Sequence, residues 1–514
     1  MSTLAAATFL HAATAQRGFV NAPGSTKYAA ISLFANSTSD LPAGVAVSIG
    51  TVTKHPGNPL LVQDKPWEPR LDNSYPNVVH APKDPLGAYR LWYGGFIAGN
   101  HFNCSQGAHR VNAWHYANSS DGIVWSKPAL GLFNLSKVPQ CSAAAKAAGT
   151  QNNIIIGGDG TGIFRDDDDR DASRRFKAFG TLCPQGGSCV SGVATSADGL
   201  TWNDLTPVAW PAPQRYDCHQ NVVRDPANGV FVYTTRDGFS QGPGRTVGIA
   251  TAKTPTSAYG VVDLTKAPAE VERGDSKGAH QLYAQVTFPF YNIWLGLVDV
   301  FDTALPSTFG HGTVHTRLSY SNAGPLGPWE WVDPDGLLGA PLIPNGDMKK
   351  KEFDDHIIFP AHIPFTVHPS PSSNASNSVV RVYYMGGNGP HNGARNTSLG
   401  LASLRADGFS GIAGTSASSF QTTSTVRVTG KYLRVSLDQK GGAAAAFSFK
   451  IGVRGVEGIT VADCDGAEGG SGVTDAVVGY ASGATFESLV GSSVLLDIQM
   501  AHAILYTISF TDTK

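Results

Sequence analysis

The segment from Trp67 to Gly95 reads WEPRLDNSYPNVVHAPKDPLGAYRLWYGG. Two carboxylates, Glu68 and Asp72, precede the apolar stretch YPNVVHA. A turn rich in Asp, Pro and Gly then leads into the alternating stretch YRLWYGG. Apolar and alternating runs on either side of such a turn are typical of a β-hairpin. The segment therefore predicts a hairpin with acidic residues at its entry.

The same unit recurs twice downstream. Asp217 opens DCHQNVVRDPANGVFVYTTRD, in which NVV again precedes a turn and a return strand. Near Asp354, the string EFDDHIIFPAHIPF is followed by a polar loop and the strand VVRVYYMGG. Because self-similar units indicate a repeat architecture, we expect Asp72, Asp217 and Asp354 to hold equivalent positions at the starts of equivalent strands.

Strand signals repeat in five sets between residues 51 and 412. Two of the outer strands carry the pattern S-x-D-G-x-x-W, at Ser119 to Trp125 and Ser196 to Trp202. We interpret this pattern as a tight Asp-Gly turn whose following aromatic residue packs back on its own blade. Five sets of inner and outer strands predict a five-bladed β-propeller.

The flanking segments predict further domains. Residues 1–16 are a possible leader, and residues 17–50 contain two strands expected to pack on the propeller. A Ser/Thr-rich linker at 413–424 precedes short alternating segments over 425–514, which predict a β-sandwich. The expected fold class is therefore all-β: a five-bladed β-propeller followed by a C-terminal β-sandwich.

Composition limits the classes of function. The net charge of −2 offers no electrostatic footprint for nucleic acid or for an anionic membrane surface. No run of eighteen apolar residues is present, so no membrane span is predicted. Gly (59 residues) and Pro (31 residues) are abundant and only 15% of residues are charged, which favours an all-β chain full of tight turns.

The cysteines and the leader together indicate a secreted or extracytoplasmic protein. Cys183 and Cys189 close the short loop CPQGGSC, and Cys104 with Cys141 is a second candidate pair; both disulfides need an oxidising compartment. Cys218 and Cys464 are expected to be buried free thiols. Six N-glycosylation sequons are present, against roughly four expected by chance.

Several strings resemble known carbohydrate-active proteins. A propeller followed by a sandwich is similar to glycoside hydrolase family 32, whose propeller is shared with family 43. The strings PWEPRLDNSYPNVV, DCHQNVVRDPANGVFVYTTR, EFDDHIIFP, YYMGGNGPH, GLASLRADGFSG and GITVADCDG resemble those of bacterial proteins with a family 32-like N-terminal domain. The chain lacks the Asn-Asp-Pro-Asn and Glu-Cys motifs of true family 32 enzymes. Its Arg-Asp-Pro lies in a hairpin turn, so we interpret Asp225 as a residue that forms the turn and not as a catalytic acid.

A pair of carboxyl groups is what glycosidic bond cleavage requires. In a propeller, the starts of the innermost strands gather at one mouth, so acids from different blades can meet there. We predict Asp72 as the nucleophile or base and Asp217 as the second carboxylate, with Asp354 or Glu68 as the proton donor. The structural alternative is that each Asp caps a loop by accepting backbone N–H bonds.

Donor groups around these acids are candidates for binding sugar hydroxyls: Asn73, His219, Gln220, Asn221 and His391. Trp67 offers a face on which a sugar ring can stack. The alternative for the polar residues is a buried structural role. The acidic run from Asp166 to Asp169 is a candidate calcium site, but a charge run beside Arg and Lys is more typical of a solvated hairpin loop. No metal or other cofactor is therefore predicted.

The leading hypothesis is a glycoside hydrolase, exo-acting on a furanoside or a related sugar in an oligo- or polysaccharide, with a carbohydrate as its only predicted partner. The rival hypothesis is a carbohydrate-binding or surface-structural protein that keeps the propeller without catalysis. The missing family motifs favour the rival, and the recurring carboxylates favour the enzyme.

Overall fold

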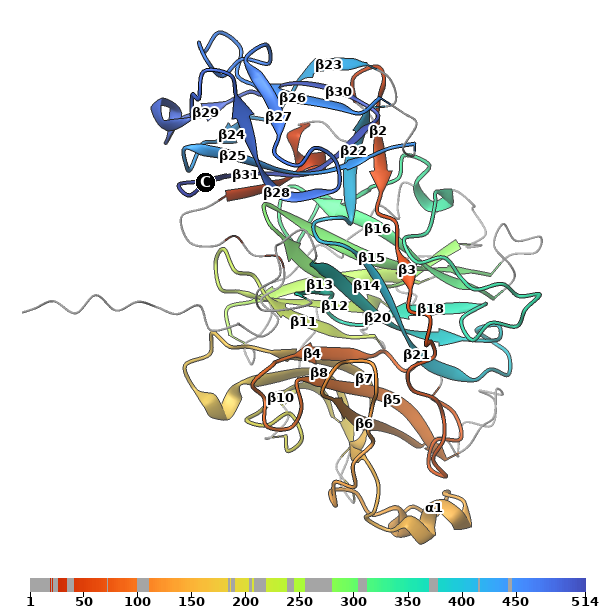
Figure 1. Cartoon of the computed structure of the whole chain (residues 1–514). Helices are drawn as coiled ribbons and strands as arrows, with labels where there is room; N and C mark the ends of the chain where they lie inside the picture. Colours follow the sequence, from red (N-terminus) through yellow and green to blue (C-terminus); the bar gives the residue numbers. More distant parts are fainter. Residues whose placement is uncertain are drawn as a thin grey trace, which may run out of the picture.

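A computed structural model describes most of the 514-residue chain, and it is all-β with almost no helix (Figure 1). The described residues are 19, 21, 26–34, 41–71, 73–98, 111–183, 185, 190–202, 206–207, 219–237, 245–254, 280–303, 312–368, 378–414, 417–441 and 446–514. Within them the α-helix is α1 (Ala143–Ala148). The 3-10 turns are η1 (Ala30–Leu33), η4 (Leu135–Lys137), η5 (Ala172–Arg174), η6 (Gly336–Leu338) and η8 (Glu487–Leu489).

The first large sheet contains seven antiparallel strands in reverse chain order, so every neighbour in sequence is a neighbour in space. Its strands are β4 (Asn77–His80), β5 (Tyr89–Ala98), β6 (Val111–Ser119), β7 (Ile154–Arg165), β8 (Phe176–Cys183), β9 (Val190–Ser196) and β10 (Thr206–Pro207). A three-stranded sheet follows, with β11 (Asn221–Arg224), β12 (Phe231–Asp237) and β13 (Thr246–Ala252). The hairpins predicted at Trp67 to Gly95 and after Asp217 are confirmed as β4–β5 and β11–β12.

The second large sheet has nine strands and joins distant parts of the chain. Its strands are β14 (His280–Phe290), β15 (Ile293–Asp302), β16 (Val314–Ser321), β17 (Glu330–Trp331), β18 (Ile357–Pro360), β19 (Phe365–Val367), β20 (Val379–Gly387), β21 (Thr397–Arg405) and β3 (Thr53–Lys54). The short strand β3 pairs with β21, so a segment from before the first hairpin closes onto the last strand of this series (Figure 1).

The C-terminal strands form a third seven-stranded sheet and two small ones. The large sheet contains β1 (Thr26–Ala29), β2 (Val45–Ile49), β22 (Ser410–Gly414), β25 (Tyr432–Gln439), β27 (Cys464–Ala467), β28 (Val473–Tyr480) and β31 (Ala503–Thr511). The small sheets contain β23 (Ser418–Gln421), β26 (Ser448–Gly452) and β30 (Asp497–Ala501), and β24 (Val426–Arg427) with β29 (Ser493–Val494). Val435, Ile451 and Ile498, from two of these sheets, share one buried apolar cluster.

The N-terminal strands hydrogen-bond into the C-terminal sheet. β1 pairs with β31 and β2 pairs with β22 (Figure 1). The same segment also contacts the propeller-like part: Phe19 forms a bridge with Phe290, and Ala29 and Ile31 belong to the apolar cluster of that part. The segment expected to be a linker, 413–424, instead contains the end of β22 and all of β23. Sequence alternation identified the strands but not their partners, because pairing depends on contacts hundreds of residues apart.

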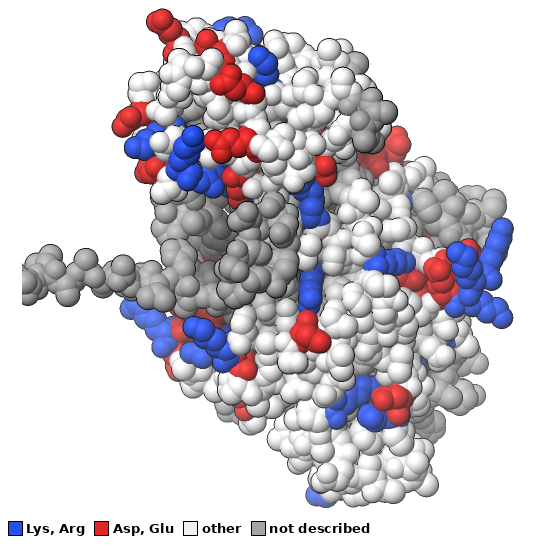
Figure 2. Space-filling model, viewed as in Figure 1, with Lys and Arg blue, Asp and Glu red and all other residues white. Residues whose placement is uncertain are grey.

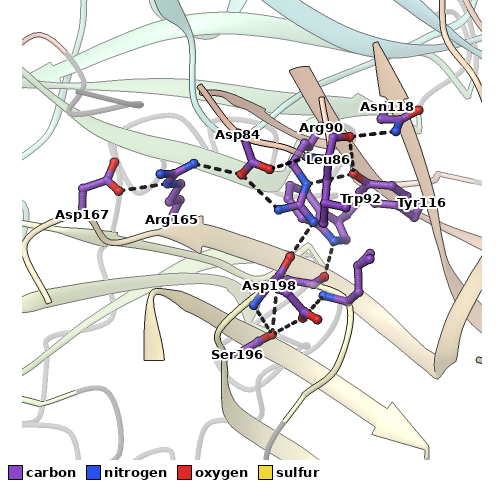
Figure 3. Close-up of polar contacts among 12 residues, drawn as sticks. Asp84, Leu86, Arg90, Trp92, Tyr116, Asn118, Arg165, Asp167, Ser196 and Asp198 are labelled. Carbon is purple, nitrogen blue, oxygen red and sulfur yellow. Dashed lines mark hydrogen bonds and ion pairs between the residues drawn. The ribbon is translucent and has the colours of Figure 1, made fainter. Parts of the chain in front are cut away.

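The two S-x-D-G-x-x-W turns dock onto aromatic and arginine side chains of another hairpin. In the second turn, Asp198 Oδ1 accepts the backbone N–H groups of Leu200 and Thr201, each at 2.8 Å. The turn carbonyls of Asp198 and Gly199 accept hydrogen bonds from Arg90 and Trp92 of β5 (Figure 3). The prediction that the motif is a tight turn is confirmed, and its main contacts are with the neighbouring hairpin.

The first turn repeats this arrangement at the other end of the strand series. Arg381 donates to the carbonyl of Asp121 at 2.7 Å, and Tyr383 donates to that of Gly122 at 2.8 Å. The Trp125 ring packs edge-on against Tyr383 of β20. This turn, which follows β6, therefore joins the first large sheet to β20 of the second large sheet.

Charged side chains of both signs lie interspersed on the face seen in Figure 2. Among the described residues, no helix is long and apolar enough to cross a membrane.

Candidate functional site

Two residues with left-handed backbone mark the entries of the β4–β5 and β11–β12 hairpins. Tyr75 has φ 35° and His219 has φ 62°, and each lies two residues before the Asn that starts its strand. Such values are uncommon for residues other than Gly and persist only where the surroundings enforce them. The two rings stack with centroids 4.6 Å apart. The entries of β4 and β11, far apart in sequence, therefore meet, as the repeat predicts.

A hydrogen-bond network joins this point to two other segments. Asn73 Nδ2 donates to the hydroxyls of Tyr75 at 2.6 Å and Tyr283 at 2.7 Å. Arg395 donates to Asn73 Oδ1 at 2.7 Å, and the Tyr283 hydroxyl lies 2.9 Å from His391 Nε2. We call these five residues the mouth network. All but the half-buried His391 are buried, so the network holds fixed donors and acceptors with one side chain at its outer edge.

One of the stacked rings, that of His219, contacts a buried carboxyl group. His219 Nδ1 is 3.2 Å from Asp299 Oδ2, and both side chains are buried. Burial, with the positive charge of Arg236 nearby, lowers the pKa of His219 to about 3. Burial also raises the pKa of Asp299 well above its ordinary value. Burial therefore shifts both pKa values in the direction that favours the uncharged form of each group.

The two predicted proton donors lie in separate ion pairs. Asp354 Oδ2 contacts Lys54 Nζ at 2.6 Å and accepts the Tyr384 hydroxyl at 2.8 Å. Glu68 Oε2 lies 2.5 Å from Lys127 Nζ, and its other oxygen accepts the hydroxyl of a buried tyrosine at 2.8 Å. Neither carboxylate contacts the mouth network, so the structure does not bring these two residues to one point.

By residue count, Asp355 and not Asp354 corresponds in position to Asp72. Asn77 pairs with Trp92, which lies two residues before the pair Gly94-Gly95, and Pro360 pairs with Tyr384, which lies two residues before Gly386-Gly387. Asp72 lies five residues before Asn77, whereas Asp355 lies five and Asp354 six residues before Pro360. Asp354 and Asp355 both lie in the turn that precedes β18. The equivalence of Asp72, Asp217 and Asp354 stays a prediction.

Asp72 and Asp217 lie outside the described residues, and so do Cys104, Cys189 and Cys218. Their chain neighbours are described: Asn73 follows Asp72 directly and belongs to the mouth network, and His219 lies two residues after Asp217.

The other predicted binding residues are buried. Trp67 donates its indole N–H to Asn153 at 2.8 Å and is 8% exposed, so it offers no open stacking face. Asn221 pairs with a residue of β12 and donates weakly to the carbonyl of His219 at 3.5 Å. Gln220 packs so closely on Gly160 that a Cβ there would come within 1.6 Å of its side-chain oxygen. Gly160 therefore brings the middle of another strand, β7, to the same place.

Sequence analysis missed several residues at this site: Tyr75, Tyr283, Arg395, Asp299 and Asp159. Asp159 is exposed and directly precedes Gly160. In the sequence, Asp159 precedes the run GIFR, which is followed by a turn and the return strand RFKAFGTL. This order of acid, strand, turn and return strand is the same as in the three hairpins from which the acids were predicted. Asp299 was detectable as the single carboxylate inside the apolar strand IWLGLVDVF. Tyr283 and Arg395 carried no comparable local pattern.

The acidic run and the cysteines have structural partners. Asp166 lies 2.5 Å from Arg224 and 3.1 Å from Lys177, and Asp169 lies 2.7 Å from Lys177. Protein cations therefore hold these carboxylates, and the described residues contain no group of metal-ligating side chains.

The predicted pairing of Cys104 with Cys141 is wrong, because Cys141 is a buried free thiol that donates to a backbone carbonyl. Cys464 is a buried free thiol as predicted. Cys183 is disulfide-bonded, but its pairing with Cys189 stays a prediction because Cys189 lies outside the described residues.

No protein-family profile and no curated protein matches the sequence. Solved structures similar to this one include an N-acetylgalactosamine deacetylase from F. plautii in complex with blood group B trisaccharide, with 17% identity, TM-score 0.40, and coverage of 70% of this chain and 95% of that one. A thermostable family-43 glycoside hydrolase has 12% identity, TM-score 0.39, and coverage of 64% and 88%. A family 117 glycoside hydrolase from Zobellia galactanivorans has 11% identity, TM-score 0.36, and coverage of 70% and 91%. Similarities of this size carry no conclusion about activity, and the resemblance to family 32 stays a prediction.

Proposed function

We propose that the protein is a glycoside hydrolase that removes sugar units from the end of an oligo- or polysaccharide, with a furanoside or a related sugar as substrate. Asp72 serves as nucleophile or base, and Asp217 is the second carboxylate that positions the sugar or steadies developing positive charge. The strand sets are interpreted as five propeller blades, and the C-terminal sheets as a sandwich packed on them. A protein of this kind acts outside the cytoplasm, where polymeric glycans occur.

The mouth network is the observation that carries this proposal. Asn73, Tyr283 and Arg395 come from three separate segments, and their polar groups bond one another at 2.7 Å. Such a fixed array of amide, phenol and guanidinium groups suits the positioning of a hydroxyl-rich ligand. Two predicted carboxylates flank it in sequence, which supplies the acids that glycoside hydrolysis needs.

The proton donor requires a carboxyl group that can reach the substrate. Asp354 and Glu68 are each held in an ion pair with a lysine, and neither contacts the mouth network. Asp159 is exposed in the middle of β7, at a break in the strand register beside the glycine that contacts Gln220. We therefore propose Asp159 as the donor in place of the two residues chosen from the sequence.

Hydrolysis of a panel of aryl furanosides and aryl pyranosides tests the activity directly. We expect release of the aryl group from at least one furanoside, and stepwise release of single sugars from the matching oligosaccharide. Chromatography of early time points distinguishes stepwise release from internal cleavage. A panel without any turnover contradicts the enzymatic proposal.

Arg395 is expected to position the mouth network without touching the reacting atoms. Replacing Arg395 with Met removes its hydrogen bond to Asn73, and we expect kcat/KM to fall roughly tenfold to a hundredfold, because small misplacements of binding groups cost rates of this order. The matched control is Arg381→Met, which removes hydrogen bonds to a turn carbonyl and to Tyr383. Equal losses in both variants would indicate a general effect on folding.

A non-catalytic carbohydrate-binding protein is the second candidate. The observation that favours it is that Glu68 and Asp354, two of the four acids predicted from the sequence, are in ion pairs. Such a protein would bind members of the glycan panel in calorimetry while releasing no product, and Asp72→Asn would leave its affinity within about twofold of the wild type.

A further inference from the structure

A cavity of about 540 Å³ lies beside the mouth, between the start of β6, the loop around η4 and the first half of β7. This volume is within the range of small-molecule binding sites, roughly 300–1,000 Å³. Asp159 is one of its lining residues. Asp159 is followed by Gly160, which packs on Gln220. Gln220 follows His219, whose ring stacks on Tyr75 of the mouth network. These contacts place the cavity next to the proposed catalytic region.

The walls of the cavity combine an apolar side with polar groups. Phe133, Val138 and Pro139 provide carbon surface, whereas Asn112 and Thr181 provide amide and hydroxyl groups. A sugar ring has the complementary pattern, since its C–H faces are apolar and its rim carries hydroxyls. The lining therefore fits a neutral sugar ring better than a purely apolar ligand.

Two polar groups on the lining, the Asn112 side-chain oxygen and the Lys137 ammonium, have no protein partner within the described part of the chain. The side-chain oxygen of Asn112 is buried and accepts no hydrogen bond among the described residues. Buried acceptors are nearly always satisfied, so this oxygen calls for a donor from elsewhere. Lys137, at the end of η4, makes no ion pair within the described part of the chain. A ligand hydroxyl in the cavity supplies the donor that Asn112 lacks, and it can accept from Lys137.

We propose that this cavity is a subsite for a second sugar ring, so that the protein recognises substrates at least two residues long. The inference rests on the proposed function, because it places the scissile bond between the mouth network and Asp159. Asn112 and Lys137 are the residues that determine the preference for longer substrates. They bind the second ring and take no part in bond cleavage.

The test measures binding and turnover separately, with fructo-, arabino- and xylo-oligosaccharides of two to five residues as probes. We expect Asn112→Leu to weaken binding of these oligosaccharides about fivefold to tenfold, the effect of one lost hydrogen bond, while hydrolysis of a single-sugar aryl glycoside stays unchanged. Asn112→Asp keeps an acceptor and is expected to retain most of the affinity. Asn118→Leu, on the same strand but outside the cavity, is the matched control.

The outcomes separate the subsite from the activity. Binding that Asn112→Leu weakens, without any turnover, supports the subsite and contradicts the glycosidase. Turnover with equal affinity in Asn112→Leu and Asn118→Leu contradicts the subsite and leaves the glycosidase standing. Oligosaccharides that neither bind nor react contradict both proposals. Lys137→Met is the second variant, and an unchanged preference for chain length in it would also count against the subsite.

Discussion

Replacing Asp72 with Asn is expected to lower kcat/KM on the best aryl furanoside by roughly a thousandfold or more. Asn keeps the size of the side chain but cannot act as a nucleophile or base, so the loss reflects chemistry at the transition state. Asp217→Asn is expected to be comparably impaired. Steady-state rates on the aryl glycoside panel measure both effects, and circular dichroism establishes that the variants are folded.

The controls are the carboxylates that sequence analysis selected but the structure pairs with lysines. Glu68→Gln and Asp354→Asn each remove one member of a buried ion pair. We therefore expect both variants to lower the free energy of unfolding, whereas kcat of the folded protein changes little. A loss of kcat in Asp354→Asn as large as in Asp72→Asn, with the protein folded, would return Asp354 to the catalytic role. Activity that survives Asp72→Asn would contradict the two-carboxylate proposal.

Much of the local structure was predictable because its signals are short-range. The alternating segments around Asn77 and Asn221 predicted hairpins, and both are confirmed. The S-x-D-G-x-x-W turns were predictable for the same reason, since Asp198 bonds backbone groups two and three residues ahead. Such bonds are set by local sequence and need no knowledge of distant partners.

The site was only partly predictable because it depends on side-chain direction and on long-range contacts. Asp354 belongs to the predicted segment, but its side chain is paired with Lys54, a residue 300 positions away in the sequence. The hydrogen bond between Asn73 and Arg395 joins residues 322 positions apart in the sequence, and no local sequence pattern predicts it. Asp159 was missed because its hairpin lacks the NVV string that identified the other units, although its turn and return strand were present.

A buried ion cluster outside the site carries the largest expected effect on stability. Lys27 Nζ contacts the carboxylates of Asp407 at 2.5 Å and Asp475 at 2.8 Å. Asp407 also accepts hydrogen bonds from three hydroxyl groups, those of Tyr291, Ser436 and Thr507. These residues come from β1, the β14–β15 turn, the β21–β22 turn and the three strands β25, β28 and β31. The cluster thus joins the N-terminal strand, the propeller-like part and the C-terminal sheet.

Asp407→Asn is expected to lower the free energy of unfolding by about 3–5 kcal/mol, because it leaves Lys27 buried beside a neutral group. Asn tolerates the left-handed backbone at this position, where φ is 64°, so the change tests charge and not strain. The matched control is Asp475→Asn, with φ 52° and the same lysine as partner. The Asp475 side chain is 31% exposed against 3% for Asp407, so we expect about 1 kcal/mol or less.

The pH dependence of unfolding gives an independent check of the same cluster. Burial alone would raise the pKa of Asp407, but Lys27 and the hydroxyl donors outweigh it and hold that pKa below 3.8. A carboxyl whose pKa is lower in the folded state stabilises the fold above its unfolded pKa, and this contribution disappears as the pH falls through the folded value. Wild type should therefore lose stability below about pH 4 more steeply than Asp407→Asn.

The alkaline side has the opposite sign. Burial lowers the pKa of Lys27, but Asp407 and Asp475 together raise it above 10.5. Its contribution is complete below that value and is lost as the pH rises through the folded pKa, so the ion cluster is intact from about pH 4 to about pH 10. Urea unfolding across this range measures both limbs. Parallel curves for wild type and Asp407→Asn, or equal destabilisation by Asp407→Asn and Asp475→Asn, would show that the buried charge does not hold these three parts of the chain together.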